Sequence, residues 1–242
     1  MAAAAAESRD PMSSTAGFAF APVAAPSLPV RGSALRVPVH RIYCIGRNYE
    51  AHAVEMGHDP SKEPPFFFQK NPGNLLCGRD FPYPPETSDV HHEIEMVATL
   101  SKGGKNIAVA DALGHVFGYG VGLDMTRRDL QGEAKKLGRP WEVGKAFEHS
   151  APCSEIVPAS EIGHPDHGAI WLKVSGEVRQ QGDLNQMIWK TAEQVAILSR
   201  YFELQPGDVI FTGTPSGVGP VKRGDEMEAF VEGVGSLRLR VV

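Results

Sequence analysis

Cysteine is scarce in this chain of 242 residues, which holds only Cys44, Cys77 and Cys153, far apart and without a CxxC pair. This spacing argues against a disulfide framework and a structural zinc site, and for a reducing, cytoplasmic compartment. No apolar run approaches the roughly 20 residues of a membrane span, so we expect no contact with a membrane. Positive charge is also in deficit, with 24 Lys and Arg against 29 Asp and Glu. A net charge of −5 argues against a nucleic-acid partner, and an anionic substrate would need a local group of cations.

Length and composition indicate a globular protein of one large domain or two small ones. The first eleven residues lack the basic segment and apolar core of a signal peptide, and Met12 is a plausible natural start. Residues 12–38 are rich in Ala, Pro, Ser and Val, which favours an extended arm. We therefore expect a leader and N-terminal arm over residues 1–38 and a single catalytic domain over residues 39–242.

The pattern of apolar residues and chain breakers predicts a β-rich α+β fold. Helices are expected over 48–57, where Asn48 is the N-cap, over 126–140, where Thr126 and Asp129 form a capping box, and over 191–204. The remaining ordered segments read as strands, including a hairpin about Ser175 and Gly176. These strand segments are 40–46, 63–73, 89–100, 115–125, 169–180, 205–221 and 225–242. Few helices among many short strands exclude a doubly wound parallel sheet.

Two carboxylates stand side by side in the strand "DVHHEIEMVATL", residues 89–100. Because strand side chains alternate between faces, Glu93 and Glu95 point the same way, with Cα atoms roughly 6–7 Å apart. The opposite face, from His92 to Leu100, is plain core. Either the two glutamates lie on the solvated face of an edge strand, or a cation lies between them.

Asp124 is the best candidate for a third acidic ligand. It lies where a strand meets a helix start, after a stretch that Gly118, Gly120 and Gly122 are expected to make flexible. A ligand set of carboxylates without His or Cys suits a hard cation, so Mg²⁺ (or Mn²⁺) is the expected metal.

A candidate general base lies on the first predicted helix. His52 and Glu55 are three residues apart and share a face, so the carboxylate can orient the imidazole to take a proton from water. An exposed pair without function is the alternative. Arg47, Arg128 and Lys145 are candidates for binding an anionic substrate, although each also fits an ordinary surface charge.

The loop "TGTPSGVG", residues 212–219, follows a predicted strand and could present backbone N–H groups to an oxyanion. It is not a phosphate loop, because no Lys-Ser or Lys-Thr ends it, and no GxGxxG motif precedes a helix in the chain. An ordinary turn is the other interpretation of this loop.

Five motifs, in this order, resemble the fumarylacetoacetate hydrolase family: "GRNYEAHAVEMG", "HHEIE", "GVGLDMTRRDLQ", "PWEVGKAFEHSAPC" and "GDVIFTGTPSGVGPV". The resemblance runs from about residue 40 to the C-terminus and is strongest to the members that cleave acylpyruvates. It implies a mixed β-sandwich roll, a homodimer and a Mg²⁺ or Mn²⁺ site. It also implies an activity, the hydrolysis of a small anionic 2-oxo acid, first of all fumarylpyruvate to fumarate and pyruvate in the gentisate pathway of aromatic catabolism.

The same resemblance implies roles for individual residues. Glu93, Glu95 and Asp124 would bind the metal, and His52 and Glu55 would activate water on a lid segment. Lys145 and Gln131 would contact the substrate, with Arg128, Gly213 and Thr214 nearby, and Lys145 would also help to stabilise the departing pyruvate enolate. Arg47 stays a candidate for binding the same anionic substrate. The sequence departs from the family at "FFFQKNPG", where Asn71 stands between Lys70 and the proline that usually follows it.

Other activities remain open at such a site. The same enolate-stabilising groups fit another acylpyruvase, an oxaloacetate decarboxylase or a hydroxydienoate isomerase, although the His52–Glu55 pair favours hydrolysis. A cupin-type oxygenase would need an HxH ligand pair, which "HHEIE" lacks. A metal-binding scaffold without catalysis would not need His52 and Glu55 on one helix face.

Overall fold

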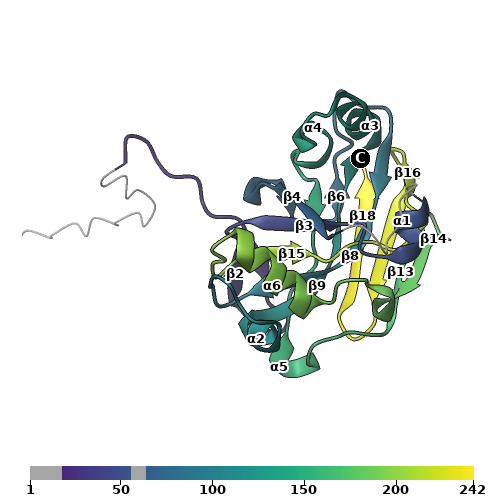
Figure 1. Ribbon diagram of the computed structural model, residues 1–242. Helices are drawn as coiled ribbons and strands as arrows, with labels where there is room; N and C mark the ends of the chain where they lie inside the picture. The colour runs from purple at the N-terminus through teal and green to yellow at the C-terminus, as the bar shows by residue number, and fades with distance from the viewer. Residues whose placement is uncertain (1–17, 56–63) are drawn as a thin grey trace, which may run out of the picture.

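The computed structural model describes residues 18–55 and 64–242, and it is built around two β-sheets with short helices at their edges (Figure 1). The larger sheet has the strand order β12 (Val157–Pro158), β9 (Val116–Leu123), β8 (Ile94–Leu100), β15 (Val209–Phe211), β3 (Ile42–Gly46) and β4 (Phe66–Lys70). The second sheet has the order β14 (Glu177–Asp183), β13 (Ala169–Val174), β17 (Glu226–Val231), β18 (Gly235–Val241) and β6 (Asp80–Phe81). Both sheets are mixed, since β15 runs parallel to β3 and β18 parallel to β6.

Smaller elements complete the fold. A three-stranded sheet is formed by β10 (Thr126–Arg127), β7 (Val90–His92) and β16 (Gly219–Val221), and two-stranded ones by β1 (Ser27–Pro29) with β2 (Arg36–Pro38) and by β11 (Ala151–Pro152) with β5 (Leu75–Leu76). The helices are α1 (Glu50–Glu55), α2 (Val109–Ala112), α3 (Arg128–Leu137), α4 (Glu142–Lys145), α5 (Ala159–Ile162) and α6 (Thr191–Tyr201). Single 3₁₀ turns lie at Pro72–Asn74, Leu113–His115 and Leu184–Gln186. These elements confirm the β-rich α+β fold.

The larger sheet is buried on both faces, because a separate apolar cluster covers each. Met96 and Ala98 of β8 pack into the main core, which also receives Ile170 and Leu172 from the second sheet. Val97 points the other way, into a cluster built with residues that precede the sheet: Leu28, Val30, Val37 and Val39. The alternative that Glu93 and Glu95 lie on the solvated face of an edge strand is therefore wrong, since β8 is buried and lies between β9 and β15.

Local signals located the elements well but misassigned two caps. The hairpin turn at Ser175 and Gly176 is confirmed, with both residues at positive φ. Asn48 does not cap α1; its side chain instead bonds Trp189 and the carbonyl oxygen of Thr212. Thr126 lies in β10 rather than at the N-cap of α3, because its hydroxyl is taken up by the acidic site described below.

The glycines of β9 serve close packing rather than flexibility. A Cβ on Gly118 would lie 2.2 Å from the carbonyl oxygen of Val157, and one on Gly122 would lie 2.6 Å from the Phe211 ring. Val157 and Phe211 therefore pack directly against this strand. Their contacts hold the strand end next to Asp124 in a defined position.

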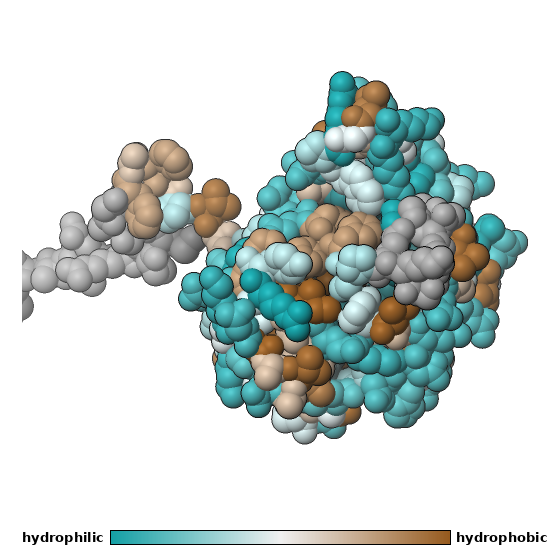
Figure 2. Space-filling model, viewed as in Figure 1, coloured by the Kyte–Doolittle hydropathy of each residue, from teal (hydrophilic) through white to brown (hydrophobic). Residues whose placement is uncertain are grey.

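Residues 18–26, just before β1, extend away from the body of the molecule (Figure 1), and the side chains from 18 to 25 are exposed. On the face shown in Figure 2, hydrophobic residues form small separate patches within a mostly polar surface. Across the residues that the structure describes, no helix is both long enough and apolar enough to span a membrane.

Candidate functional site

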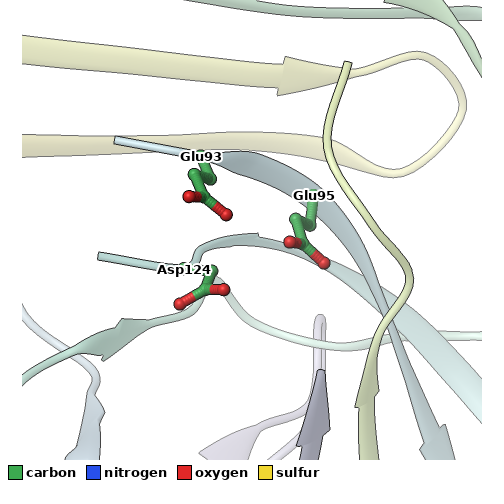
Figure 3. A group of neighbouring side chains, drawn as sticks. All are labelled: Glu93, Glu95 and Asp124. Atoms are coloured by element: carbon green, nitrogen blue, oxygen red, sulfur yellow. The ribbon is translucent and has the colours of Figure 1, made fainter. Parts of the chain in front are cut away.

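Three carboxylates meet where β8 begins and β9 ends. Glu95 lies on β8, Glu93 directly precedes that strand, and Asp124 directly follows β9, which pairs antiparallel with β8. The pairing brings the backbone N–H of Asp124 to within 2.9 Å of the Glu93 carbonyl oxygen. One carboxylate oxygen from each residue lies within 4.8 Å of the others, and all three side chains are buried. Figure 3 shows the carboxylates pointing toward one another.

Two lysines neutralise part of this acidic group. Lys145, from the single-turn helix α4, places Nζ 2.7 Å from Asp124, 3.0 Å from Glu93 and 2.7 Å from the hydroxyl of Thr126. Its three N–H donors are thus all engaged. Lys70, at the end of β4, forms an ion pair with the other Asp124 oxygen at 2.8 Å and donates to the carbonyl oxygens of Met125 and Lys145.

The pKa values of the two glutamates are shifted in opposite directions by their surroundings. Burial alone would raise the pKa of Glu93, but Lys145 and Arg128 outweigh it and hold that pKa below its ordinary range. Burial, together with the charges of Asp124 and Glu93, instead raises the pKa of Glu95 well above its ordinary value. Glu95 therefore lacks a full counter-charge, although its Oε2 accepts a 2.6 Å hydrogen bond from the Gly213 amide.

His52 and Glu55 form the pair expected from their spacing. Nδ1 of His52 lies 3.2 Å from a carboxylate oxygen of Glu55, and the histidine is only 6% exposed. Glu55 also accepts two 3.3 Å contacts from the Gly217 amide, which link α1 to the loop after β15. With Nδ1–H donated to the carboxylate, Nε2 is the basic nitrogen of this imidazole.

The carboxylates and His52 line one pocket. Most of the residues predicted for the site from sequence line it too: Arg47, Glu93, Glu95, Asp124, Arg128, Gln131, Lys145 and Thr214. Glu55 and Gly213 do not line it; they contact residues that do. Arg128 is engaged with Glu93 and, at 2.7 Å, with the side-chain oxygen of Gln131.

Gly213 is required for a steric reason. It has φ +103°, and a Cβ there would lie 2.5 Å from the Cβ of Asn48. The backbone N–H of Gly213 donates its hydrogen bond to Glu95. This N–H is therefore not one of the loop amides that could face an oxyanion of the substrate. Gly213 instead positions a carboxylate of the acidic group.

Several contributors to the site went unrecognised in the sequence. Lys70 and Thr126 contact the acidic group directly, and Gln180 of β14, in the second sheet, bonds residues next to it. The amide of Gln180 donates to Thr214 and to the Pro215 carbonyl at 2.8 Å and accepts from the backbone N–H of Ile94 at 3.0 Å. The sequence drew attention to Lys70 only through the break in the family pattern at Asn71. That break put the function of Lys70 in doubt and did not indicate a contact with the acidic group.

Fold and site together define a class of protein: a mixed α+β roll with a buried three-carboxylate centre open to one pocket. The model of the fumarylacetoacetate (FAA) hydrolase C-terminal family matches residues 41–242. The chain belongs to this family, which confirms the resemblance inferred from the motifs.

Three members of the family are similar in sequence to this chain over most of its length. A fumarylpyruvate hydrolase from Pseudomonas aeruginosa, solved in complex with Mn²⁺ and pyruvate, is 53% identical with a TM-score of 0.91, over 93% of this chain and 98% of that one. A fumarylpyruvate hydrolase from Ralstonia sp. is 45% identical over 184 residues, covering 76% of this chain and 95% of the relative. The mitochondrial oxaloacetate tautomerase of Bos taurus is 40% identical over 200 residues, covering 83% and 90%.

Proposed function

We propose that this protein is a metal-dependent hydrolase that cleaves the C–C bond of an acylpyruvate, with fumarylpyruvate giving fumarate and pyruvate. One observation carries the proposal: the three-carboxylate group and the His52 imidazole open into the same pocket. The first can bind a cation and the second can activate water, which are the two requirements of this reaction. The fumarylpyruvate hydrolase relatives support the same substrate.

The residues present fit a divalent metal. Glu93, Glu95 and Asp124 offer only oxygen ligands, as Mg²⁺ and Mn²⁺ prefer, and burial next to two other carboxylates leaves Glu95 short of positive charge. When bound there, the cation would supply positive charge for the carboxylate and 2-oxo groups of the substrate. The related structure from Pseudomonas aeruginosa, which contains Mn²⁺ and pyruvate, supports this assignment.

The roles of the chain's own residues follow from their contacts. His52 takes a proton from water through Nε2, while Glu55 holds Nδ1–H and stabilises the imidazolium that forms. The resulting hydroxide attacks the carbonyl carbon of the acyl half, and the bond to the pyruvate methylene then breaks. The acyl half leaves as fumarate, and the electron pair of the broken bond forms the pyruvate enolate, which takes up a proton to give pyruvate. Lys145 lies at the carboxylate centre and is suited to stabilise the departing enolate, once a bound cation relieves part of its pairing with Asp124.

Arg47, Arg128, Gln131 and Thr214 line the pocket and complete the proposed substrate contacts. Gly213 belongs with them through its hold on Glu95 rather than through a contact of its own. We place this machinery in a catalytic domain of residues 39–242 that acts as a homodimer in the cytoplasm. Of the arm expected before residue 39, residues 27–38 pack against this domain as β1 and β2.

A second candidate function is the tautomerisation of oxaloacetate. It is favoured by the identity to the oxaloacetate tautomerase of Bos taurus, which extends over 83% of this chain. Tautomerisation needs a base and a group that stabilises an enolate, but no attacking water. The two functions therefore make different demands on the same pocket.

The deciding experiment is a substrate panel with Mg²⁺ or Mn²⁺. Fumarylpyruvate, maleylpyruvate and acetylpyruvate are assayed for C–C cleavage, and oxaloacetate is assayed for both decarboxylation and enol–keto exchange. We expect cleavage of fumarylpyruvate to be fastest and to stop in EDTA. Rapid enol–keto exchange of oxaloacetate without cleavage of any acylpyruvate would assign the second function instead.

A further inference from the structure

An aromatic wall, formed by Phe66, Phe68 and Trp141, lines the pocket in addition to the acidic group. The ring of Trp141 meets Phe66 edge-on at 5.5 Å between centroids and lies 5.8 Å from Phe68. Lys135 of α3 also lines the pocket and holds its Nζ 5.0 Å from the centre of the Trp141 ring. Trp141 directly precedes α4, and Figure 1 shows α3 and α4 side by side.

Cations already pair with two of the three carboxylates of the acidic group. The carboxylates of Glu93 and Asp124 pair with Lys70, Lys145 and Arg128. A divalent cation bound there would make the pocket positive overall, which favours a substrate with more than one negative charge.

Lys135 adds a further positive charge to this pocket. Among residues 18–55 and 64–242, no carboxylate forms an ion pair with it. Partial burial lowers its pKa, and the nearby charges of Arg128 and Arg47 lower it further. Its neighbour Lys136 is exposed and does not line the pocket, so the two lysines at the end of α3 differ in surroundings.

We propose that Lys135 is a specificity-determining residue that binds the terminal carboxylate on the acyl half of a dicarboxylic 2-oxo acid. The inference rests on the proposed function, because that function places the 2-oxo acid end of the substrate at the acidic group. The aromatic wall then packs against the acyl chain, and a planar unsaturated chain suits such faces. The ammonium over Trp141 supplies the charge for the far end, so acyl groups with a terminal carboxylate are preferred over neutral ones.

The test uses two ligands that differ only at that end. 2-Oxoheptanedioate has the chain length of fumarylpyruvate and lacks its second oxo group, so it binds without cleavage; 2-oxoheptanoate lacks the terminal carboxylate. Both are titrated calorimetrically into the Mn²⁺-loaded full chain. Wild type is expected to favour the dicarboxylate, and Lys135→Met to lose roughly 10- to 100-fold of that preference, as for a hydrogen bond to a charged group.

Three further variants separate charge from structure. Lys135→Gln should behave like Lys135→Met, Lys135→Arg should retain part of the preference, and Lys136→Met should match wild type. A wild-type protein with no preference, or a Lys135→Met protein with the full preference, would overturn the proposal. Cleavage of fumarylpyruvate is assayed in parallel: its absence would refute the proposed function, while the ratio of the two affinities still decides the role of Lys135.

Discussion

At the scale of single residues, Glu95 is the member of the acidic group with the least compensation. Lys145 and Arg128 serve Glu93, and Lys70 and Lys145 serve Asp124, whereas the polar partner of Glu95 is the amide of Gly213. A buried carboxylate with a raised pKa is costly to ionise unless a cation arrives. Glu95 is therefore the residue at which metal binding and protein stability should be most directly linked.

Glu95→Gln tests that link. The amide keeps the shape of the side chain and relieves the repulsion from Asp124 and Glu93, so the metal-free variant should unfold at a temperature no lower than wild type. It should lose most of the stabilisation that added Mn²⁺ gives wild type, because binding to the native state alone is what raises stability. Thermal unfolding with and without Mn²⁺ measures both effects. Equal stabilisation of variant and wild type would exclude Glu95 as a ligand.

Gly213→Ala tests the steric requirement at the same contact. The methyl group would clash with Asn48 and add backbone strain at φ +103°, so we expect a loss of roughly 1–3 kcal/mol in the free energy of unfolding. Gly224→Ala is the matched control, since Gly224 has φ +94° and a methyl group there would meet no atom within 4 Å. Urea denaturation of both variants separates the clash from the strain. A loss no larger at Gly213 than at Gly224 would contradict the steric argument.

At the scale of elements, the site depends on α1 and on the loop that follows β15. Glu55 on α1 binds His52 within the helix and the amide of Gly217 in the loop. The Asn48 side chain, just before α1, bonds the Thr212 carbonyl oxygen at the start of that loop. Two separate hydrogen-bonded contacts, one from Glu55 and one from Asn48, thus tie the segment that carries the proposed base to the loop that carries Gly213.

The division of labour between α1 and the β8–β9 pair predicts distinct variants. His52→Ala should lower kcat for fumarylpyruvate by roughly 10²–10⁴, the usual value of general-base catalysis, while Mn²⁺ and oxalate affinities stay near wild type. Glu55→Ala should lower kcat less in the His52→Ala background than in wild type, because the two residues act as one unit. Asp124→Asn should weaken the binding of both Mn²⁺ and oxalate. Kinetics and calorimetry on the four variants decide, and loss of Mn²⁺ binding in His52→Ala would show the assignment to be wrong.

At the scale of the whole molecule, the pocket collects side chains from segments far apart in the chain. Lys70 ends β4, Lys145 ends α4 and Asp124 follows β9, yet both ammonium groups lie within 3 Å of the Asp124 carboxylate. The second sheet adds Gln180, which bonds both the loop at Thr214 and the strand at Ile94. Packing of the two sheets is thus a condition for the geometry of the site.

Family membership also predicts an assembly. We expect the protein to be a homodimer, so light scattering at micromolar concentration should give twice the mass of one chain. Concentration-independent monomer mass over that range would contradict the expectation.

The sequence by itself determined the features that depend on local spacing. Alternation along a strand put Glu93 and Glu95 on one side, the three-residue interval put His52 beside Glu55, and glycine at positive φ marked the hairpin turn at Gly176. The helix expected over 126–140 is present for the same reason, as α3 over Arg128–Leu137 with Gly138 as its C-cap. Each of these relations joins residues that are close along the chain.

Only the tertiary structure decided the rest. Four features depend on how the sheets and helices pack against one another. They are the burial of β8, the ion pair of Lys70 with Asp124, the hydrogen bond from Gly213 to Glu95 and the position of Lys135 over Trp141. Thr126 shows most clearly where prediction from local sequence fails. Its local pattern favoured a helix cap, but its hydroxyl instead donates a hydrogen bond to Glu93 and accepts one from Lys145. A buried charge costs more to leave unpaired than a helix end costs to leave uncapped, so the tertiary demand prevailed over the local preference.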